Sequence, residues 1–192
     1  MTSTPDTAPS DSRLRRALPG DLPEKAAVGR MLRVDHAGEY GARRIYAGQL
    51  AVLGGRQCTG IIRKMAEQEE EHLAAFGRLM KQRHVRPTAL MPLWHVAGYA
   101  VGALTALLGE KAAMACTVAV ESVIGEHYAR QETALPDGEA ALKQTIAQFR
   151  EDEMEHHHTG LEHGAEDTPF YHALTQAIRL GTRGAIWLSE RV

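Results

Sequence analysis

The sequence predicts an all-α protein, a four-helix bundle with one crossover helix and one extra helix at the C-terminus. Apolar residues recur in alternating steps of three and four along most of the 192 residues, which is the spacing of one buried helix face. Aromatic residues make up only 5% of the chain and alanine is plentiful, as in closely packed helices. Two Glu-x-x-His segments, Glu69–His72 and Glu153–His156, each follow a lone glutamate at a similar interval and indicate two helical hairpins.

The bulk composition bounds the classes of protein that fit. There are 22 basic and 24 acidic residues, so the net charge of −2 gives no reason to expect a nucleic-acid partner. Cys58 and Cys116 are the two cysteines and form no Cys-x-x-Cys, which argues against a rubredoxin-type iron site and a disulfide framework. Residues 24–192 are expected to form one domain. Residues 1–23 are rich in Pro, Ser, Thr and Asp and lack the apolar core of a secretory signal, so we expect a disordered arm.

The first hairpin is predicted from helices over residues 24–53 and 59–84, with Gly54-Gly55 ending the first. The buried face of the first helix is Leu32, Asp35, Glu39, Ala42, Tyr46, Gln49 and Leu53. The buried face of the second is Ile62, Met65, Glu69, His72, Phe76 and Leu79. Charged side chains are almost never buried without a partner, and a bound metal ion would be that partner here.

The stretch from Thr88 to Gly109 contains no Lys, Arg, Asp or Glu. Pro92, His95 and three glycines weaken it as a membrane-spanning helix. We expect a crossover helix whose exposed apolar face lies on a membrane surface or admits a lipid-like substrate. A fully buried helix is the second alternative and a spanning helix the third.

The second hairpin is predicted from helices over residues 111–134 and 139–163, joined by a turn at Pro136-Asp137-Gly138. The buried face of the first is Met114, Thr117, Glu121, Ile124 and Tyr128. That of the second is Leu142, Ile146, Phe149, Glu153, His156, Gly160 and His163. Thr168 as N-cap and Pro169 as first residue are expected to open a last amphipathic helix that reaches the C-terminus.

These polar residues predict a dinuclear metal centre. Residues three apart on a helix share a face, so each Glu-x-x-His can aim a carboxylate and an imidazole at one point. Two such pairs plus one Glu from each of two more helices form the metal site of ferritin-like bundles. The six candidate ligands are Glu39, Glu69, His72, Glu121, Glu153 and His156. Four carboxylates balance two divalent ions, and a site with more carboxylates than imidazoles suits iron and O2 chemistry better than zinc.

Several neighbours of these ligands have weaker or open predictions. Asp152 can accept a hydrogen bond from a ligating histidine of the opposing helix, and Gln68 occupies the equivalent place in the first half. Tyr128 can hydrogen-bond near the metals or simply pack. His36 is a rival to Glu39, one turn earlier. Three further histidines are expected to be solvated or at helix ends rather than ligands: His157, His158 and His163.

Long motifs around these residues resemble the demethoxyubiquinone hydroxylases of ubiquinone biosynthesis. The segment from Arg33 to Ala42 resembles the first ligand motif of that family, and the resemblance extends from about Ala26 to Val192. Further matching segments are 44–49, 86–88, 90–94, 105–109, 113–121 and 188–191. Ser122 stands where relatives can have a second acid, and the N-terminal arm has no usable counterpart.

The resemblance implies a ferritin-like di-iron monooxygenase that hydroxylates the quinone ring of demethoxyubiquinone to demethylubiquinone with O2 and two electrons. The ligands of the family fall on the same six residues, and His127-Tyr128 matches a His-Tyr pair near its site. NADH or the quinol form of the substrate would supply the electrons. The sequence has no dinucleotide-binding fingerprint, so a tightly bound nucleotide is not expected.

The expected partners are an isoprenoid quinone, a membrane surface met through residues 88–109, and either other ubiquinone-biosynthesis proteins or a second copy of the chain. The expected location is the cytoplasmic face of a bacterial inner membrane, or the matrix side of the mitochondrial inner membrane in a eukaryote. Two alternatives remain open. A ferroxidase would share the ligands but favours a polar exterior, and a non-catalytic membrane-associated bundle would leave the buried polar residues unexplained.

Overall fold

The computed structural model describes residues 22–192, and every regular element within that range is helical. The long helices are α1 (Glu24–Leu53), α2 (Thr59–Gln82), α3 (Met91–Leu107), α4 (Glu110–Ala134), α5 (Ala140–Glu162) and α6 (Tyr171–Ser189). Two short 3₁₀ helices, η1 (Asp137–Glu139) and η2 (Ala165–Asp167), precede and follow α5. The predicted disordered arm falls on residues 1–23, of which 1–21 lie outside the described residues.

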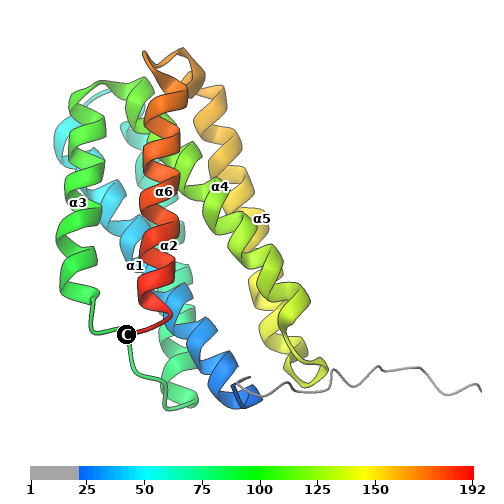
Figure 1. The fold of residues 1–192 in the computed structure, drawn as a ribbon. Coiled ribbons are helices and arrows are strands. Elements are labelled where there is room, and N and C mark those ends of the chain that lie inside the picture. Colours follow the sequence, from blue (N-terminus) through cyan, green and yellow to red (C-terminus); the bar gives the residue numbers. More distant parts are fainter. Residues whose placement is uncertain (1–21) are drawn as a thin grey trace, which may run out of the picture.

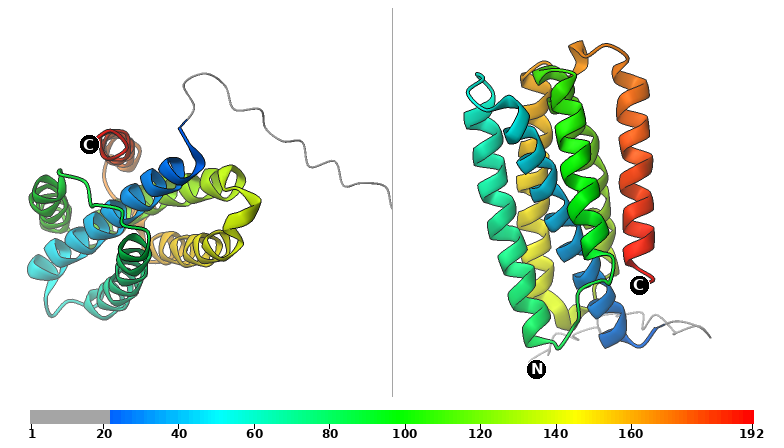
Figure 2. Two further views of the ribbon diagram at one scale, coloured as in Figure 1. Left: turned by 90° about the horizontal axis from the view of Figure 1, so that it is seen from below. Right: turned by 90° about the vertical axis from the view of Figure 1, so that its left-hand side faces the viewer.

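Helices α1, α2, α4 and α5 form the four-helix bundle, and α3 and α6 lie outside it (Figure 1). Seen along the helices, α3 and α6 stand on the same side of the bundle, flanking α1 (Figure 2). In the first hairpin α1 packs against α2, and α3 lies along α1. The second hairpin packs through α4 against α5, and α6 lies along α4. This arrangement confirms the predicted ferritin-like all-α bundle with a crossover helix and an extra C-terminal helix.

The predicted buried faces agree closely with the structure. Every residue of the predicted faces of α1 and α4 is buried. Two apolar clusters form the core, one around Phe76 and Ile146 and the other around Ile62 and Met114. Helix α4 is buried on all sides from Ala112 to Glu121, because α6 and η2 cover the face that the bundle leaves open.

Glycines explain how closely α3 approaches α1. A Cβ added to Gly102 would lie 1.9 Å from the carbonyl oxygen of Ile45, and one added to Gly48 would lie 2.2 Å from that of Tyr99. At Gly98 the distance to the carbonyl oxygen of Gly41 would be 2.8 Å. Gly98 and Gly102, two of the three glycines that weaken this stretch as a spanning helix, are therefore required for the packing of α3 against α1.

The main differences from prediction occur at helix ends. Helix α2 ends at Gln82 rather than at His84, whose φ of 55° is left-handed. Helix α5 ends at Glu162, so His163 is exposed rather than part of the buried face. The predicted start of the last helix is wrong, because α6 begins at Tyr171 and the hydroxyl of Thr168 caps nothing.

Two residues of the predicted buried faces are only partly buried. Met80 replaces Leu79 as the last fully buried residue of α2, and Phe149 on α5 is likewise only partly covered.

Along residues 22–192, no helix has both the length and the hydropathy needed to cross a membrane.

Candidate metal centre

The structure brings all six predicted ligands together in the middle of the bundle. Glu39 comes from α1, Glu69 and His72 from α2, Glu121 from α4, and Glu153 and His156 from α5. We call this set the Glu/His cluster. Each of its side chains is at most 3% exposed. The cluster lies between the two apolar parts of the core, because each member occupies a position on the buried face of its helix where a plain bundle would carry an apolar residue.

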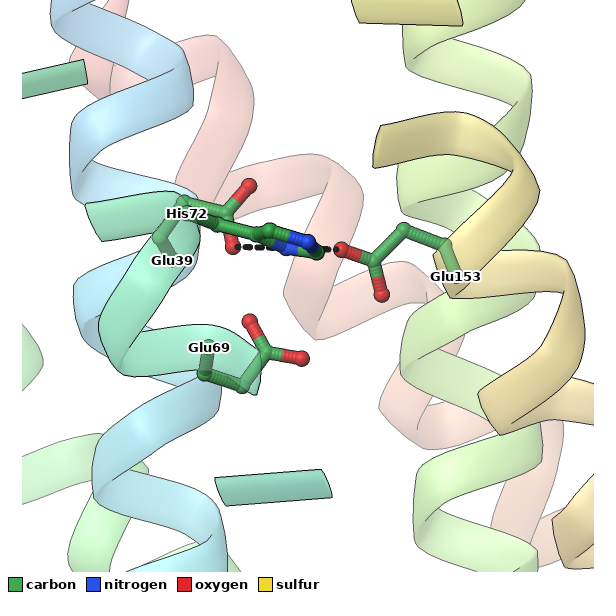
Figure 3. Close-up of side chains that lie close together, drawn as sticks. All are labelled: Glu39, Glu69, His72 and Glu153. Atoms are coloured by element: carbon green, nitrogen blue, oxygen red, sulfur yellow. Dashed lines mark ion pairs between the residues drawn. The ribbon is translucent and has the colours of Figure 1, made fainter. Parts of the chain in front are cut away.

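The cluster divides into two overlapping groups of possible ligands. In one group, atoms of Glu39, Glu69, His72 and Glu153 all lie within 4.8 Å of one another; Figure 3 shows these four side chains converging from three helices. The other group joins Glu69, Glu121, Glu153 and His156 within the same limit. Glu69 and Glu153 belong to both groups. The other two members of each group are one Glu and one His, so the two groups have the same composition.

Both histidines are oriented by a residue of the opposing helix. Nε2 of His72 lies 3.0 Å from Oδ2 of Asp152, and Nε2 of His156 lies 3.1 Å from Oε1 of Gln68. Because carboxylate and amide oxygens accept hydrogen bonds, Nε2 is the protonated nitrogen in each contact. Each Nδ1 therefore faces the carboxylates. The contact expected of Asp152 is present, and Gln68 makes the equivalent contact in the first half of the chain.

Two tyrosines hold the lone glutamates of the cluster in a crossed arrangement. The phenol of Tyr46 on α1 donates a hydrogen bond to Glu121 on α4, 2.8 Å away. The phenol of Tyr128 on α4 donates one to Glu39 on α1. For Tyr128 the open choice between packing and hydrogen bonding is thus resolved. The contact of Tyr46 was not predicted, although the sequence holds a signal for it, because each tyrosine follows its own glutamate by seven residues.

Burial and mutual repulsion dominate the electrostatics of the carboxylates. Burial and then the nearby Glu153 carboxylate raise the pKa of Glu69 and of Glu121 well above the usual value of 4.5. Burial by itself would raise the pKa of Glu153 too, but the imidazoles of His156 and His72 outweigh it and lower the pKa to about 2. Burial by itself lowers the pKa of His72, yet the carboxylates of Glu153 and Glu39 outweigh it and raise the pKa to about 11.

Many polar atoms of the cluster have no hydrogen-bond partner. Both carboxylate oxygens of Glu69 and Glu153, Oε2 of Glu121 and Nδ1 of both histidines are buried and unpaired. The two Nδ1 atoms lie 3.2 to 3.5 Å from carboxylate oxygens of the cluster without forming hydrogen bonds. Buried polar groups left unpaired are costly. Divalent cations would satisfy these atoms together and balance four carboxylates, so the residues present fit a pair of such ions.

A second buried polar group lies beside the cluster. Oδ1 of Asp35 accepts a hydrogen bond from Nε2 of Gln131 at 2.6 Å and lies 3.3 Å from Nε2 of His127. Asp35 stands one turn before Glu39, and burial raises its pKa. His127 was expected near the site. Its imidazole contacts Asp35, and it belongs to neither ligand group. The rival ligand His36 is only partly buried and belongs to neither ligand group.

Residues predicted to be non-ligands lie away from the cluster. His158 pairs with Glu162 on the surface, and Nδ1 of His163 lies 2.7 Å from the carbonyl oxygen of Thr159. His157 is partly buried, and burial lowers its pKa. Ser122, the departure from the family pattern, accepts a hydrogen bond from Arg179 of α6 at 3.0 Å and belongs to neither ligand group.

An apolar cavity of about 400 Å³ lies between α1, α3, α4 and α6. Its lining is almost wholly aliphatic, glycine or alanine; Trp94 and Ser189, joined by a hydrogen bond of 3.1 Å, also line it. Gly38 and Val120 line the cavity and directly precede Glu39 and Glu121. The cavity therefore reaches the two helices that carry the lone glutamates, on the face beside the cluster.

The bundle and its buried Glu/His cluster define a ferritin-like protein whose cluster is compatible with metal binding. The family model described as ubiquinone biosynthesis protein COQ7 matches residues 26–189. The chain belongs to this family.

Relatives from bacteria and eukaryotes are named as hydroxylases of demethoxyubiquinol or demethoxyubiquinone. A Rhodospirillum rubrum protein named 3-demethoxyubiquinol 3-hydroxylase is 56% identical over 176 residues, which is 91% of this chain and 83% of the relative. The human mitochondrial protein named NADPH-dependent 3-demethoxyubiquinone 3-hydroxylase is 55% identical over 88% of this chain and 79% of its own length. The mitochondrial 5-demethoxyubiquinone hydroxylase of Saccharomyces cerevisiae is 39% identical over all of this chain and 87% of its own length.

Proposed function

We propose that this protein is a 3-demethoxyubiquinone 3-hydroxylase. It inserts one oxygen atom from O2 into the quinone ring of demethoxyubiquinone, yielding demethylubiquinone in ubiquinone biosynthesis, and the reaction consumes two electrons. The observation that carries the proposal is the apolar cavity bordered by the residues next to Glu39 and Glu121. An apolar isoprenoid quinone fits such a cavity, and the names of the relatives support the same reaction.

We propose that the six residues of the Glu/His cluster hold two iron ions. Glu39 and His72 would hold one ion and Glu121 and His156 the other, while Glu69 and Glu153, which belong to both groups, would contribute to holding both. When bound, iron supplies the reduction of O2 that protein side chains cannot perform. Hard carboxylates with one borderline imidazole at each position suit Fe(II).

The side chains of the protein would orient the ligands and shield the bound ring from water. Asp152 and Gln68 hold the imidazoles with Nδ1 toward the centre. Tyr46 and Tyr128 each donate to one oxygen of a lone glutamate, which restricts how that carboxylate can turn. The aliphatic lining of the cavity would exclude water while the ring is bound. The buried tyrosines keep their protons, since burial and nearby carboxylates raise the pKa of both.

Electrons would come from a reduced nicotinamide nucleotide or from the quinol form of the substrate. The human relative is named as NADPH-dependent. Residues 22–192 form no strand–helix unit of the kind that binds dinucleotides, which favours a transient encounter over a resident nucleotide.

We propose that the protein lies on a membrane through the outer faces of α3 and α6. Large apolar side chains on these helices are exposed, from 50% for Leu93 to 69% for Leu107 on α3, and 67% for Leu180 on α6. Because the cavity lies between these two helices, docking there would let the isoprenoid tail stay in lipid while the ring enters. The membrane would be the cytoplasmic face of a bacterial inner membrane, or the matrix side of the mitochondrial inner membrane.

One assay tests the reaction. The purified protein is loaded with Fe(II) without oxygen, then given short-tailed demethoxyubiquinol and ¹⁸O2, and the quinones are analysed by mass. One labelled oxygen atom in the product supports the proposal. Iron oxidation with an unchanged quinone would instead favour the ferroxidase alternative.

A substitution tests the ligand assignment. Glu153→Ala should lose iron and turnover together, and full iron content with full turnover in that variant would refute the ligand assignment.

A further inference from the structure

Close packing requires some glycines of the long helices but not others. At Gly48, Gly98 and Gly102 an added Cβ would lie within 2.8 Å of a backbone atom, so packing of α1 against α3 requires glycine there. At Gly41 on α1 and Gly181 on α6, an added Cβ would meet no atom within 4 Å. Neither has a left-handed backbone. Packing therefore does not explain these two, and glycine inside a helix stabilises it less than alanine does.

Gly41 and Gly181 share a location instead. Both line the apolar cavity, Gly41 as a half-buried residue of its α1 wall and Gly181 as an exposed residue at its α6 rim. A side chain at either position would project into empty space that belongs to the cavity, or into its mouth.

Both glycines also stand at the level of the Glu/His cluster. Gly41 follows Glu39 by two residues on α1. The register of α6 against α4 is fixed by two contacts with the same offset of 57 residues, Arg179 to Ser122 and Arg183 to Glu126. With this offset Gly181 stands level with Ile124, less than one turn beyond Glu121. Ile124 itself lies 3.6 Å from where a Cβ of Gly38 would be.

We infer that Gly41 and Gly181 are specificity-determining residues, which keep the cavity wide enough for a quinone ring to lie beside the cluster. This inference rests on the proposed function. It assigns the two positions a role in admitting the ring rather than in folding, and it predicts that filling them harms ring binding without harming the fold.

The chain offers matched controls. Gly184 lies on α6 one turn after Gly181, and Gly77 lies on α2. At both, an added Cβ would meet no atom within 4 Å, yet neither lines the cavity. Leucine at these positions adds the same bulk to a helix without narrowing the cavity.

Binding can be measured apart from catalysis. Trp94 lines the cavity and is one of two tryptophans in the chain, so replacing the exposed Trp187 by Phe leaves Trp94 as the only reporter. Quinones quench tryptophan fluorescence on contact. Metal-free protein would be titrated with short-tailed demethoxyubiquinone in this background, comparing Gly41→Leu and Gly181→Leu with Gly184→Leu and Gly77→Leu. Gly41→Ala, with thermal unfolding measured beside it, guards against a variant that fails to fold.

The expected result is a loss of quinone affinity of about ten-fold or more in both cavity variants, and none in the controls. Gly41→Ala should bind more weakly than the parent while unfolding at the same or a higher temperature. Equal affinity in all variants, with the parent protein binding and hydroxylating the quinone, would overturn the inference and leave the proposed function standing. Absence of quinone binding and turnover in the parent would defeat the proposed function, and the inference with it.

Discussion

The phenol of Tyr46 donates a hydrogen bond to Glu121 across 75 positions of sequence, from the first helix of one hairpin to the first helix of the other. Tyr128 returns the same contact to Glu39. A tyrosine of each hairpin therefore contacts the lone glutamate of the other hairpin. The histidines are contacted in the same crossed way, His72 by Asp152 and His156 by Gln68. Each proposed ligand other than Glu69 and Glu153 is oriented by a residue from the other half of the chain.

Replacing Tyr46 by Phe should weaken metal binding at the position served by Glu121. The carboxylate loses its buried donor and with it a constraint on its orientation, and loss of such an outer contact typically costs about 10- to 100-fold in metal affinity. Calorimetric titration of the metal-free protein with Fe(II) or Mn(II) measures the change in affinity. Tyr40→Phe, which removes a hydroxyl bonded to His95 instead, is the control. Equal affinities in both variants would contradict the role given to Tyr46.

Asp152→Leu should reduce metal affinity more than Gln68→Leu does. Both substitutions leave an imidazole Nε2 without its acceptor, but the charged acceptor of His72 makes the stronger hydrogen bond. We expect a loss of about 10- to 100-fold for Asp152→Leu and a smaller one for Gln68→Leu. Metal content after dialysis against a graded chelator series ranks the variants, and the reverse ranking would argue against the charge-assisted contact.

The metal-free protein should become less stable as the pH rises from about 6 to about 8. Folding raises the pKa of Glu69 and Glu121 from 4.5, so above that pH the native state binds more protons than the unfolded chain, and stability falls with pH. His72, raised from 6.5 to about 11, acts in the same direction. The lowered pKa of Glu153 contributes stability that is lost only as the pH falls below 4.5 toward 2, so it has no effect in this window.

Urea unfolding of chelator-treated protein at the two pH values tests this expectation. Metal ions compete with the same protons, so the metal-loaded protein should show the opposite trend or none. A metal-free protein that gains stability toward about pH 8 would show that the carboxylates are not protonated in the fold.

Gly102→Ala should destabilise the fold, whereas Gly77→Ala should not. The added methyl at Gly102 would lie 1.9 Å from the backbone oxygen of Ile45, so α3 must move away from α1, at a cost of about 1–3 kcal/mol or more. At Gly77 the methyl meets open space, and the gain in helix propensity is about 0.5–1 kcal/mol. Urea unfolding measures both. Equal stability of the two variants would mean that α3 is not packed closely against α1.

Replacing Leu104 and Leu107 together by Glu should reduce binding to lipid vesicles while leaving the fold intact. These side chains are 61% and 69% exposed, so the substitutions remove few internal contacts. Vesicle sedimentation compares the variant with the parent, and far-UV circular dichroism checks its helical content. The control is Lys64→Glu at an exposed position of α2, outside the α3 and α6 faces, where vesicle binding should not change. Unaltered vesicle binding in the Leu104 and Leu107 variant would exclude the α3 face as the docking surface.

The sequence by itself determined the class of fold and the composition of the cluster. Glu39, Glu69 and Glu153 interrupt apolar faces of period 3.6, and burial of an unpaired charge is costly enough that this pattern has few explanations. The same argument identified the buried faces of α1 and α4 residue by residue. Helix ends were less predictable, as Thr168 and His163 illustrate, because one hydrogen bond or one left-handed residue decides where a helix stops.

Only the tertiary structure decided which residues meet across helices. The sharing of Glu69 and Glu153 between two ligand groups, the contact of Tyr46 with Glu121 and the cavity beside Gly41 all join residues far apart in the chain. Periodicity gives the face of a helix that is buried, but the rotation and distance between two packed helices follow from how their side chains fit together. The close approach of α3 to α1 at Gly102 is one such fit, and it helps to shape the cavity that the sequence could only suggest.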